Sequence, residues 1–277
     1  KDPAVYPKFA SQYTSENLSN NSIIVECGEK SKVVDYQDMY ETTVNYQTYS
    51  QEVTGFDGEG QLTSAINYVV SEDMPVLYTL EGHEELSMSE TMKESIQKSN
   101  IEIRDLNLLT EETVPEDTAC LFIFSPQTDI AAEEAEKIIS YLENGGKAII
   151  LSDYTDAEMP NFNSVLENYG VQTQKGIVLE GDKDHYIAQN QYYLLPNIES
   201  HEITSNLSSK SKYVLTALSQ SIKSLEDVRD TIKIDSILTT SDSAYQKTDL
   251  EAMETTEKEE GDLEGPFSLG VRSEERR

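Results

Sequence analysis

Short apolar runs alternate with helical patterns between residues 75 and 151, and this alternation most constrains the fold. Three apolar runs predict strands, at 75–80, 119–124 and 147–151. Helical spacing of apolar residues follows the first run at 87–99 and the second from about residue 131. Such alternation is typical of α/β domains. We therefore predict an α/β fold with a doubly wound, mainly parallel sheet across residues 74–225, in which these three strands are adjacent and central.

The rest of the chain predicts smaller elements. A hairpin spans residues 22–36, and apolar spacing predicts a helix at 60–70. A polar, acidic stretch at 243–262 predicts a poorly ordered segment or a long exposed loop, and residues 265–271 predict a final strand. We divide the chain into three parts, an N-terminal α/β segment, an α/β domain, and an acidic loop with a final strand, at 1–70, 71–240 and 241–277.

The stretch after the first apolar run is the best candidate for a site. Gly82 allows a sharp turn, and His83 and Glu84 follow it at the carboxyl end of the strand, where open α/β sheets bind ligands. Ser125 and Asp153 follow the two later strands. We predict that the His83 ring lies near Ser125 or Asp153 and that Gly82, His83, Glu84, Ser125 and Asp153 line a ligand groove. The alternative is a histidine that satisfies a local turn.

Composition excludes several classes of function. The formal net charge of −31 comes from 52 acidic and 21 basic residues, with no basic cluster, and this argues against nucleic acid and against an anionic membrane surface. No run of 18 apolar residues could span a membrane. Cys27 and Cys120 lie in separate apolar runs and predict two buried, reduced thiols, although sequence alone leaves a disulfide between them open. Because the chain begins at Lys1 without Met, we expect it to be a fragment.

The sequence matches none of the common catalytic motifs in full. Gly145-Gly146-Lys147 lies between a helix and a strand, so it predicts a helix end rather than a phosphate loop. Ser125 stands where a hydrolase nucleophile would, but Pro126 removes the next backbone N–H and no G-x-S-x-G surrounds it. His83, Glu84 and Glu85 with Asp153 lack the spacing of a known metal motif, so we predict no metal and no cofactor.

Several landmarks in order carry a resemblance to a known family. They are Gln61-Leu-Thr-Ser-Ala-Ile66, Leu80-Glu-Gly-His-Glu84, Ile123-Phe-Ser-Pro-Gln127, Tyr141-Leu-Glu-Asn-Gly-Gly-Lys147, Asn168-Tyr-Gly-Val171, Thr239-Thr-Ser241 and Gly261-Asp-Leu-Glu-Gly-Pro-Phe267. Together they make the chain resemble the extracytoplasmic region of the Gld-type (GldG-like) ABC-transporter auxiliary proteins, a bacterial family described in gliding motility. Each motif is weak alone, and their order gives the match its specificity.

The resemblance implies a fold, a setting and partners. It implies a sheet like that of class I glutamine amidotransferases without their catalytic cysteine, preceded by the tail of a thioredoxin-like region. It implies a non-enzymatic accessory domain of an ABC-2-type transporter, on the extracytoplasmic face of the bacterial membrane, anchored by transmembrane helices outside this chain. The implied partners are the permease, through it the ATPase subunits, and a carbohydrate or protein ligand. Two other functions stay open: a hydrolase using His83, and a purely structural spacer.

Overall fold

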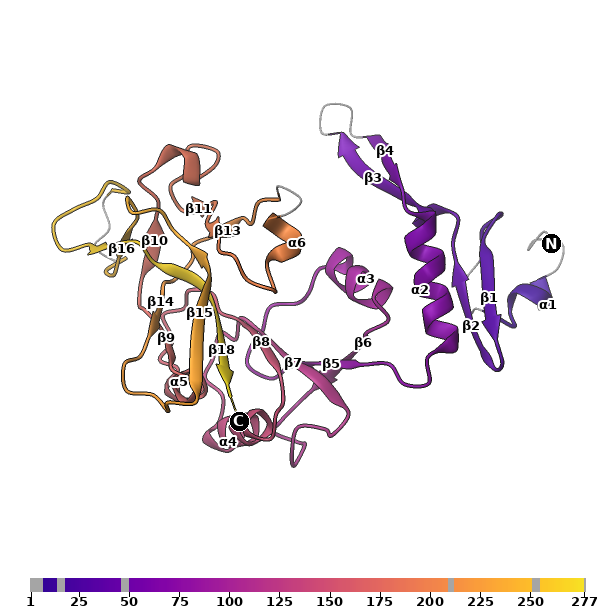
Figure 1. Ribbon diagram of the computed structural model, residues 1–277, viewed down its shortest axis with the longest axis horizontal. Coiled ribbons are helices and arrows are strands. Elements are labelled where there is room, and N and C mark those ends of the chain that lie inside the picture. The colour runs from indigo at the N-terminus through magenta and orange to yellow at the C-terminus, as the bar shows by residue number, and fades with distance from the viewer. Residues whose placement is uncertain (1–6, 14–17, 46–49, 209–211, 251–254, 277) are drawn as a thin grey trace. The chain divides into compact units, whose positions relative to one another are not determined.

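The computed structural model describes residues 7–13, 18–45, 50–208, 212–250 and 255–276 (Figure 1). The chain divides into two compact units. Unit 1 comprises Lys1–Thr79, Ser87–Asp105 and Pro115–Leu121. Unit 2 comprises Leu80–Leu86, Leu106–Val114 and Phe122–Arg277.

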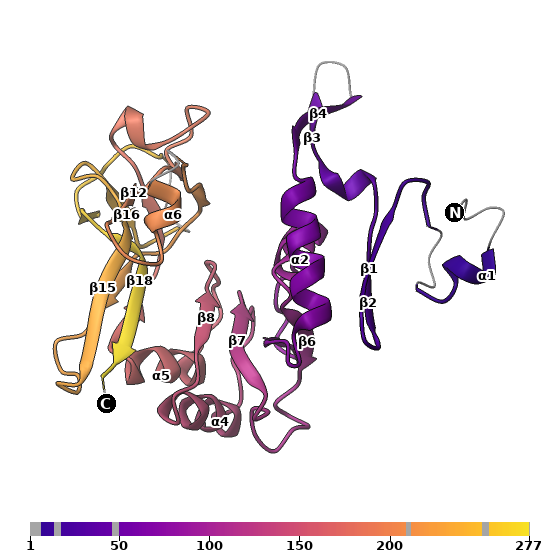
Figure 2. The same cartoon turned by 45° about the vertical axis from the view of Figure 1, so that its right-hand side comes forward.

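The first part of unit 1 is built from two hairpins and one long helix. Its elements are α1 (Pro7–Ala10), β1 (Ile23–Cys27), β2 (Lys30–Val34), η1 (Gln37–Met39), β3 (Tyr40–Asn45), β4 (Ser50–Phe56) and α2 (Gly58–Val70). The helix α2 packs on the β1–β2 hairpin (Figure 2), and its Ala65 is buried with Val34 and Met39. The predicted hairpin and helix are confirmed, whereas the antiparallel β3–β4 pair was not predicted.

Four strands form a parallel sheet in the order β6-β5-β7-β8. The elements of this region are β5 (Val76–Leu80), α3 (Glu90–Lys98), β6 (Glu102–Leu106), β7 (Thr118–Phe124), α4 (Ala132–Glu143) and β8 (Ala148–Leu151). From β5 the chain passes to β6 on one side, and β7 then lies on the other side of β5. The direction of winding therefore reverses between β5 and β7, and such a switch point is where open α/β sheets bind ligands.

The prediction that the three apolar runs are neighbours is confirmed, but the position of the last one is wrong. The strand β8 lies at an edge of the sheet, next to β7 alone among the described strands. Four of the five β5 residues are buried, whereas β8 alternates, with Ile149 and Leu151 exposed. An apolar sequence fits both a central strand and an edge strand with one covered face, so hydrophobicity alone could not predict the position of β8 in the sheet.

The doubly wound sheet is also shorter than predicted, because the strands after residue 151 form antiparallel sheets. A five-stranded sheet has the order β12-β15-β18-β14-β9, a three-stranded sheet has β10-β16-β17, and β11 pairs with β13. In the first of these, β15 and β18 lie side by side (Figures 1 and 2), with register irregularities around Leu238. The elements are α5 (Pro160–Asn168), β9 (Val171–Thr173), β10 (Ile177–Leu179), η2 (Lys183–His185), β11 (Tyr193–Leu194), β12 (Asn197–Ile198), α6 (Ser205–Ser208), β13 (Thr216–Ala217), β14 (Ile222–Ser224), β15 (Ile232–Thr239), β16 (Tyr245–Lys247), β17 (Leu263–Glu264) and β18 (Ser268–Glu275).

The prediction that residues 243–262 are poorly ordered or form a long exposed loop is wrong in part. Residues 245–247 are not an exposed loop but the buried middle strand β16 of the three-stranded sheet. Residues 256–261 are exposed, as predicted, while 251–254 lie outside the described residues. The final strand exists as β18 and begins at Ser268, three residues later than predicted.

Smaller predictions have mixed outcomes. Gly145 ends α4 with a left-handed backbone at φ 93°, which confirms the helix-end interpretation of Gly-Gly-Lys. Neither Cys27 nor Cys120 forms a disulfide, as predicted, but Cys27 is exposed rather than buried, and Cys120 is half-buried. The division of the chain into domains at 1–70, 71–240 and 241–277 stays a prediction.

Candidate functional site

The loops that follow β5 and β7 meet at the switch point of the parallel sheet. Gly82 has φ 119°, a left-handed backbone that favours glycine, and it turns the chain after β5. The carbonyl oxygen of His83 then accepts hydrogen bonds from the backbone N–H groups of Gln127 at 2.9 Å and Thr128 at 3.2 Å. Leu86 adds a bond from its N–H to the carbonyl of Phe124 at 2.9 Å. The backbones of the two loops are therefore tied together.

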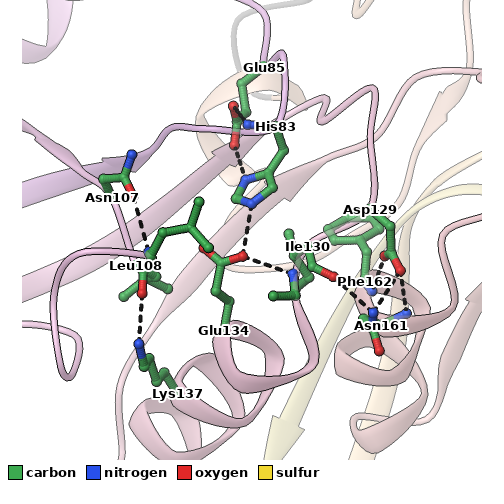
Figure 3. A network of polar contacts seen from close by, with 12 residues as sticks. His83, Glu85, Asn107, Leu108, Asp129, Ile130, Glu134, Lys137, Asn161 and Phe162 are labelled. Carbon is green, nitrogen blue, oxygen red and sulfur yellow. Dashed lines mark hydrogen bonds and ion pairs between the residues drawn. The ribbon is translucent and has the colours of Figure 1, made fainter.

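The His83 ring is enclosed between two carboxylates (Figure 3). Its Nδ1 lies 3.0 Å from Oε1 of Glu85, and its Nε2 lies 3.0 Å from Oε2 of Glu134. Only 4% of His83 is exposed. A neutral imidazole has one N–H donor, so this geometry requires either the doubly protonated ring or a protonated carboxyl group. Burial lowers the pKa of His83, but hydrogen bonding and charge from Glu85 and Glu134 outweigh burial and raise it above its ordinary value.

Glu134 connects this pair to the start of α4. Its Oε2 also accepts a hydrogen bond from the backbone N–H of Ala131 at 2.8 Å, so the carboxylate caps the N-terminus of the helix. Its Oε1 is buried and has no hydrogen-bond partner in the part of the chain that the structure describes. Sequence reasoning missed Glu134, although an acidic residue three positions after a helix start is a recognisable capping signal.

Ser125 lies in the same group of loops but makes other contacts. It is 2% exposed, has φ 53°, and donates its backbone N–H to the carbonyl of Leu151 at 2.7 Å. Its Oγ accepts a hydrogen bond from Nε2 of Gln127 at 3.1 Å. Gln127 thus links Ser125, through its side chain, to the loop that holds His83, through its backbone N–H.

The remaining predicted residues are exposed. Glu84 has φ 59°. Within the described residues, no hydrogen bond joins its side chain to the His83 ring. Asp153 accepts a hydrogen bond from the N–H of Tyr154 at 2.9 Å. The structure therefore brings Gly82, His83 and Ser125 into one loop cluster, while the ring bonds Glu85 and Glu134 rather than Ser125 or Asp153. That these residues bind a ligand stays a prediction.

Two further side chains brace the surroundings of the triad formed by His83, Glu85 and Glu134 (Figure 3). Asp129 accepts hydrogen bonds from the backbone N–H groups of Asn161 at 3.1 Å and Phe162 at 2.9 Å, which fixes the start of α5. Lys137 of α4 donates to the carbonyl oxygens of Leu108 at 2.7 Å and Glu111 at 2.9 Å. Both helices that begin near the triad are thereby held to neighbouring loops.

This arrangement suits a structural connection better than acid–base chemistry. Both nitrogens of the His83 ring are engaged, and the ring is buried. Among the described residues, no group of three or more His, Cys, Asp and Glu side chains is arranged to hold a metal ion. His83 lines neither the pocket of about 230 Å³ in unit 1 nor the pocket of about 370 Å³ beside β12 and β15 in unit 2.

Comparison with known proteins places this site within a family. The model of an auxiliary family described as an ABC-type uncharacterized transport system matches residues 74–276. The chain belongs to this family. The matched region of this transport auxiliary family includes His83, Ser125 and Glu134 and leaves residues 1–73 outside. The GldG-like branch within the family is not distinguished by this match.

Other comparisons add little. A search of curated proteins gives no match. Among solved structures, one titled "mmIFT52 N-terminal domain" is similar at 15% identity and a TM-score of 0.47, over 70% of this chain and 86% of that one. No described helix combines the length and apolar character that crossing a bilayer requires.

Proposed function

We propose that this chain is a non-enzymatic, extracytoplasmic accessory domain of an ABC-2-type transport system, which contacts the permease and, through it, the ATPase subunits. Family membership supports the transport setting. We also propose that the chain belongs to the GldG-like branch, with an amidotransferase-like sheet and a partial thioredoxin-like segment before it. In this proposal the protein acts by binding and not by chemistry.

The state of His83 is the observation that best supports a non-enzymatic role. A general base must present a ring nitrogen within hydrogen-bond reach of its substrate. Here Nδ1 and Nε2 each lie 3.0 Å from a glutamate oxygen, and the ring is almost fully buried. At the switch point, where an α/β enzyme places its reactive groups, this chain has an internal ion cluster.

A hydrolase is the second candidate, and one observation favours it. Ser125 has a left-handed backbone at the end of β7, and hydrolase nucleophiles stand on such strained turns. However, its Oγ contacts the amide of Gln127, its neighbour Pro126 has no N–H for an oxyanion, and the His83 ring is bonded elsewhere. The backbone at Ser125 thus resembles the turn that carries a hydrolase nucleophile, but no general base contacts its hydroxyl among the described residues.

Two measurements test the proposal. Chromogenic esters, anilides and glycosides should show no hydrolysis that depends on Ser125 or His83, as judged by comparing the wild-type chain with Ser125→Ala and His83→Gln. The permease and ATPase of the same transport system, reconstituted in nanodiscs, should bind the chain and change their ATP hydrolysis rate when it is added. Turnover lost in Ser125→Ala would instead establish the hydrolase, and failure to bind the permease would refute the accessory role.

A further inference from the structure

A half-buried lysine faces a small pocket in unit 1, away from the switch point. Lys32 lies on β2, and the pocket it lines has a volume of about 230 Å³. The other lining residues come from α2, α3, β6 and the segments beside them: Tyr68, Met74, Gln97, Asn100, Ile101, Glu102 and Ile103. The lining thus combines one ammonium group, one carboxylate, three amide or hydroxyl side chains and three apolar ones.

The charge of Lys32 is not neutralised by any described carboxylate. Its Nζ donates to Oδ1 of Asn100 at 3.0 Å and lies 5.2 Å from the centre of the Tyr68 ring. No ion pair joins it to an acidic side chain within the residues that the structure describes, in a chain whose net charge is −31. Burial lowers the pKa of Lys32, because the ammonium group has lost part of its water.

The one acidic residue that lines the pocket is already paired. Glu102 receives two hydrogen bonds from the guanidinium of Arg104, from Nε and Nη2, each at 2.8 Å. Such a bidentate pair occupies both carboxylate oxygens. The pocket therefore has a cation without a carboxylate partner and a carboxylate that is hydrogen-bonded to Arg104, which also pairs with Asp117 at 2.8 Å.

The polar side of the pocket is held in place by Asn100. This residue has φ 57°, and its Nδ2 donates to the carbonyl of Ser64 at 2.9 Å, which fixes which amide atom faces Lys32. Ser64 in turn donates its Oγ to the carbonyl of Lys98 at 2.5 Å. The end of α3 is thereby joined to α2, so the ammonium group is positioned before any ligand arrives.

We propose that this pocket binds a small organic monoanion, a carboxylate that pairs with Lys32 while its short apolar body lies against Met74, Ile101 and Ile103. The volume is below the roughly 300 Å³ at which typical ligand pockets begin, which limits the ligand to a few carbon atoms. A ligand carboxylate supplies the opposite charge that Lys32 does not find among the described side chains. This inference is independent of the proposed transport role.

Butyrate is the probe, and butylammonium is its control of similar size and opposite charge. In a titration followed by amide NMR shifts, butyrate should move the signals of Tyr68, Asn100 and Ile101, and butylammonium should not. Lys32→Met should weaken butyrate binding at least about tenfold, which is the effect of losing one charged hydrogen bond. Lys30→Met is the matched control, because Lys30 lies on the same strand, does not line the pocket and donates to the carbonyls of Ser71 and Glu72.

A second readout does not depend on any variant. Butyrate affinity in the wild-type chain should fall as the pH rises through the pKa of Lys32, because only the ammonium form attracts an anion. Binding of butylammonium as strong as that of butyrate would overturn the proposal. So would unchanged butyrate affinity in Lys32→Met, or the absence of any butyrate shift at these amides.

Discussion

At His83, burial lowers the pKa of the imidazole, and the neighbouring carboxylates raise it. Replacing it in His83→Gln keeps a side chain of similar size but leaves Glu85 and Glu134 without the positive charge between them. Removing one partner from a buried ion cluster is costly, so we expect the free energy of unfolding at pH 6 to fall by about 2–4 kcal/mol. Urea denaturation measures this. Glu84→Gln, at the exposed neighbour, should leave the urea midpoint unchanged, and an equal loss in both variants would contradict the role of the triad.

Because the pKa of His83 is raised in the fold, its contribution to the free energy of unfolding depends on pH. Between the unfolded value of about 6.5 and the higher folded value, the folded chain binds the proton more tightly than the unfolded chain. The stabilisation is therefore complete below about pH 6.5 and is lost as the pH rises through the folded pKa. Urea midpoints of the wild-type chain and His83→Gln should converge toward alkaline pH. A difference that grows with pH would mean that the ring is neutral in the fold.

The residue scale also shows what sequence could and could not predict about the site. The turn at Gly82 and the place of His83 after a strand follow from local pattern, and both were predicted. The partner Glu134 is 51 positions away, and nothing in the local sequence pairs it with that ring. Asp153 follows the correct strand, but its strand lies at the sheet edge, so rim position alone did not bring it to the histidine.

At the element scale, the strand β16 depends on one buried cation. Lys247 is 3% exposed, and its Nζ pairs with Glu259 at 2.7 Å and with Asp262 at 3.2 Å. Burial lowers the pKa of Lys247, but hydrogen bonds to the two carboxylates outweigh it and raise the pKa. Lys247→Met should lower the free energy of unfolding by about 1–3 kcal/mol and release the acidic segment, because Asp262 loses its counter-charge while largely buried.

Limited proteolysis with mass spectrometry measures this release as faster cleavage within residues 255–262. The matched control is Lys258→Met, because Lys258 pairs with Glu264 at 2.8 Å on the exposed surface, where ion pairs contribute little. Equal cleavage in both variants would show that the segment is held by something other than Lys247.

The same strand explains why some elements escaped prediction. The runs that became β5, β7 and α4 are apolar at the period of their own structure, so sequence predicted them. Tyr-Gln-Lys at 245–247 is polar, and its burial depends on partners that are far away in the sequence. Gln246, for example, donates to the carbonyls of Gln174 at 3.2 Å and Lys175 at 3.0 Å. The β3–β4 hairpin is rich in Thr and Val, a strand signal that its many polar residues concealed.

At the scale of the whole molecule, the net charge of −31 opposes folding. Self-repulsion of that size destabilises a compact chain, whereas the surface ion pairs that salt would weaken contribute little each. Raising NaCl from about 10 mM to about 100 mM at pH 7 shortens the screening length from about 30 Å to about 10 Å. We therefore expect salt to raise the melting temperature by about 2–4 °C, equivalent to about 1 kcal/mol.

The sign of this salt effect separates repulsion from attraction within the fold. Calorimetry at matched ionic strengths of NaCl and KCl should give the same increase, because screening depends on ionic strength and not on the cation. Near the isoelectric point of about 4.2, the net charge and with it the increase should vanish. A melting temperature that falls with salt at pH 7 would mean that attraction within ion pairs outweighs the repulsion among the remaining acidic residues.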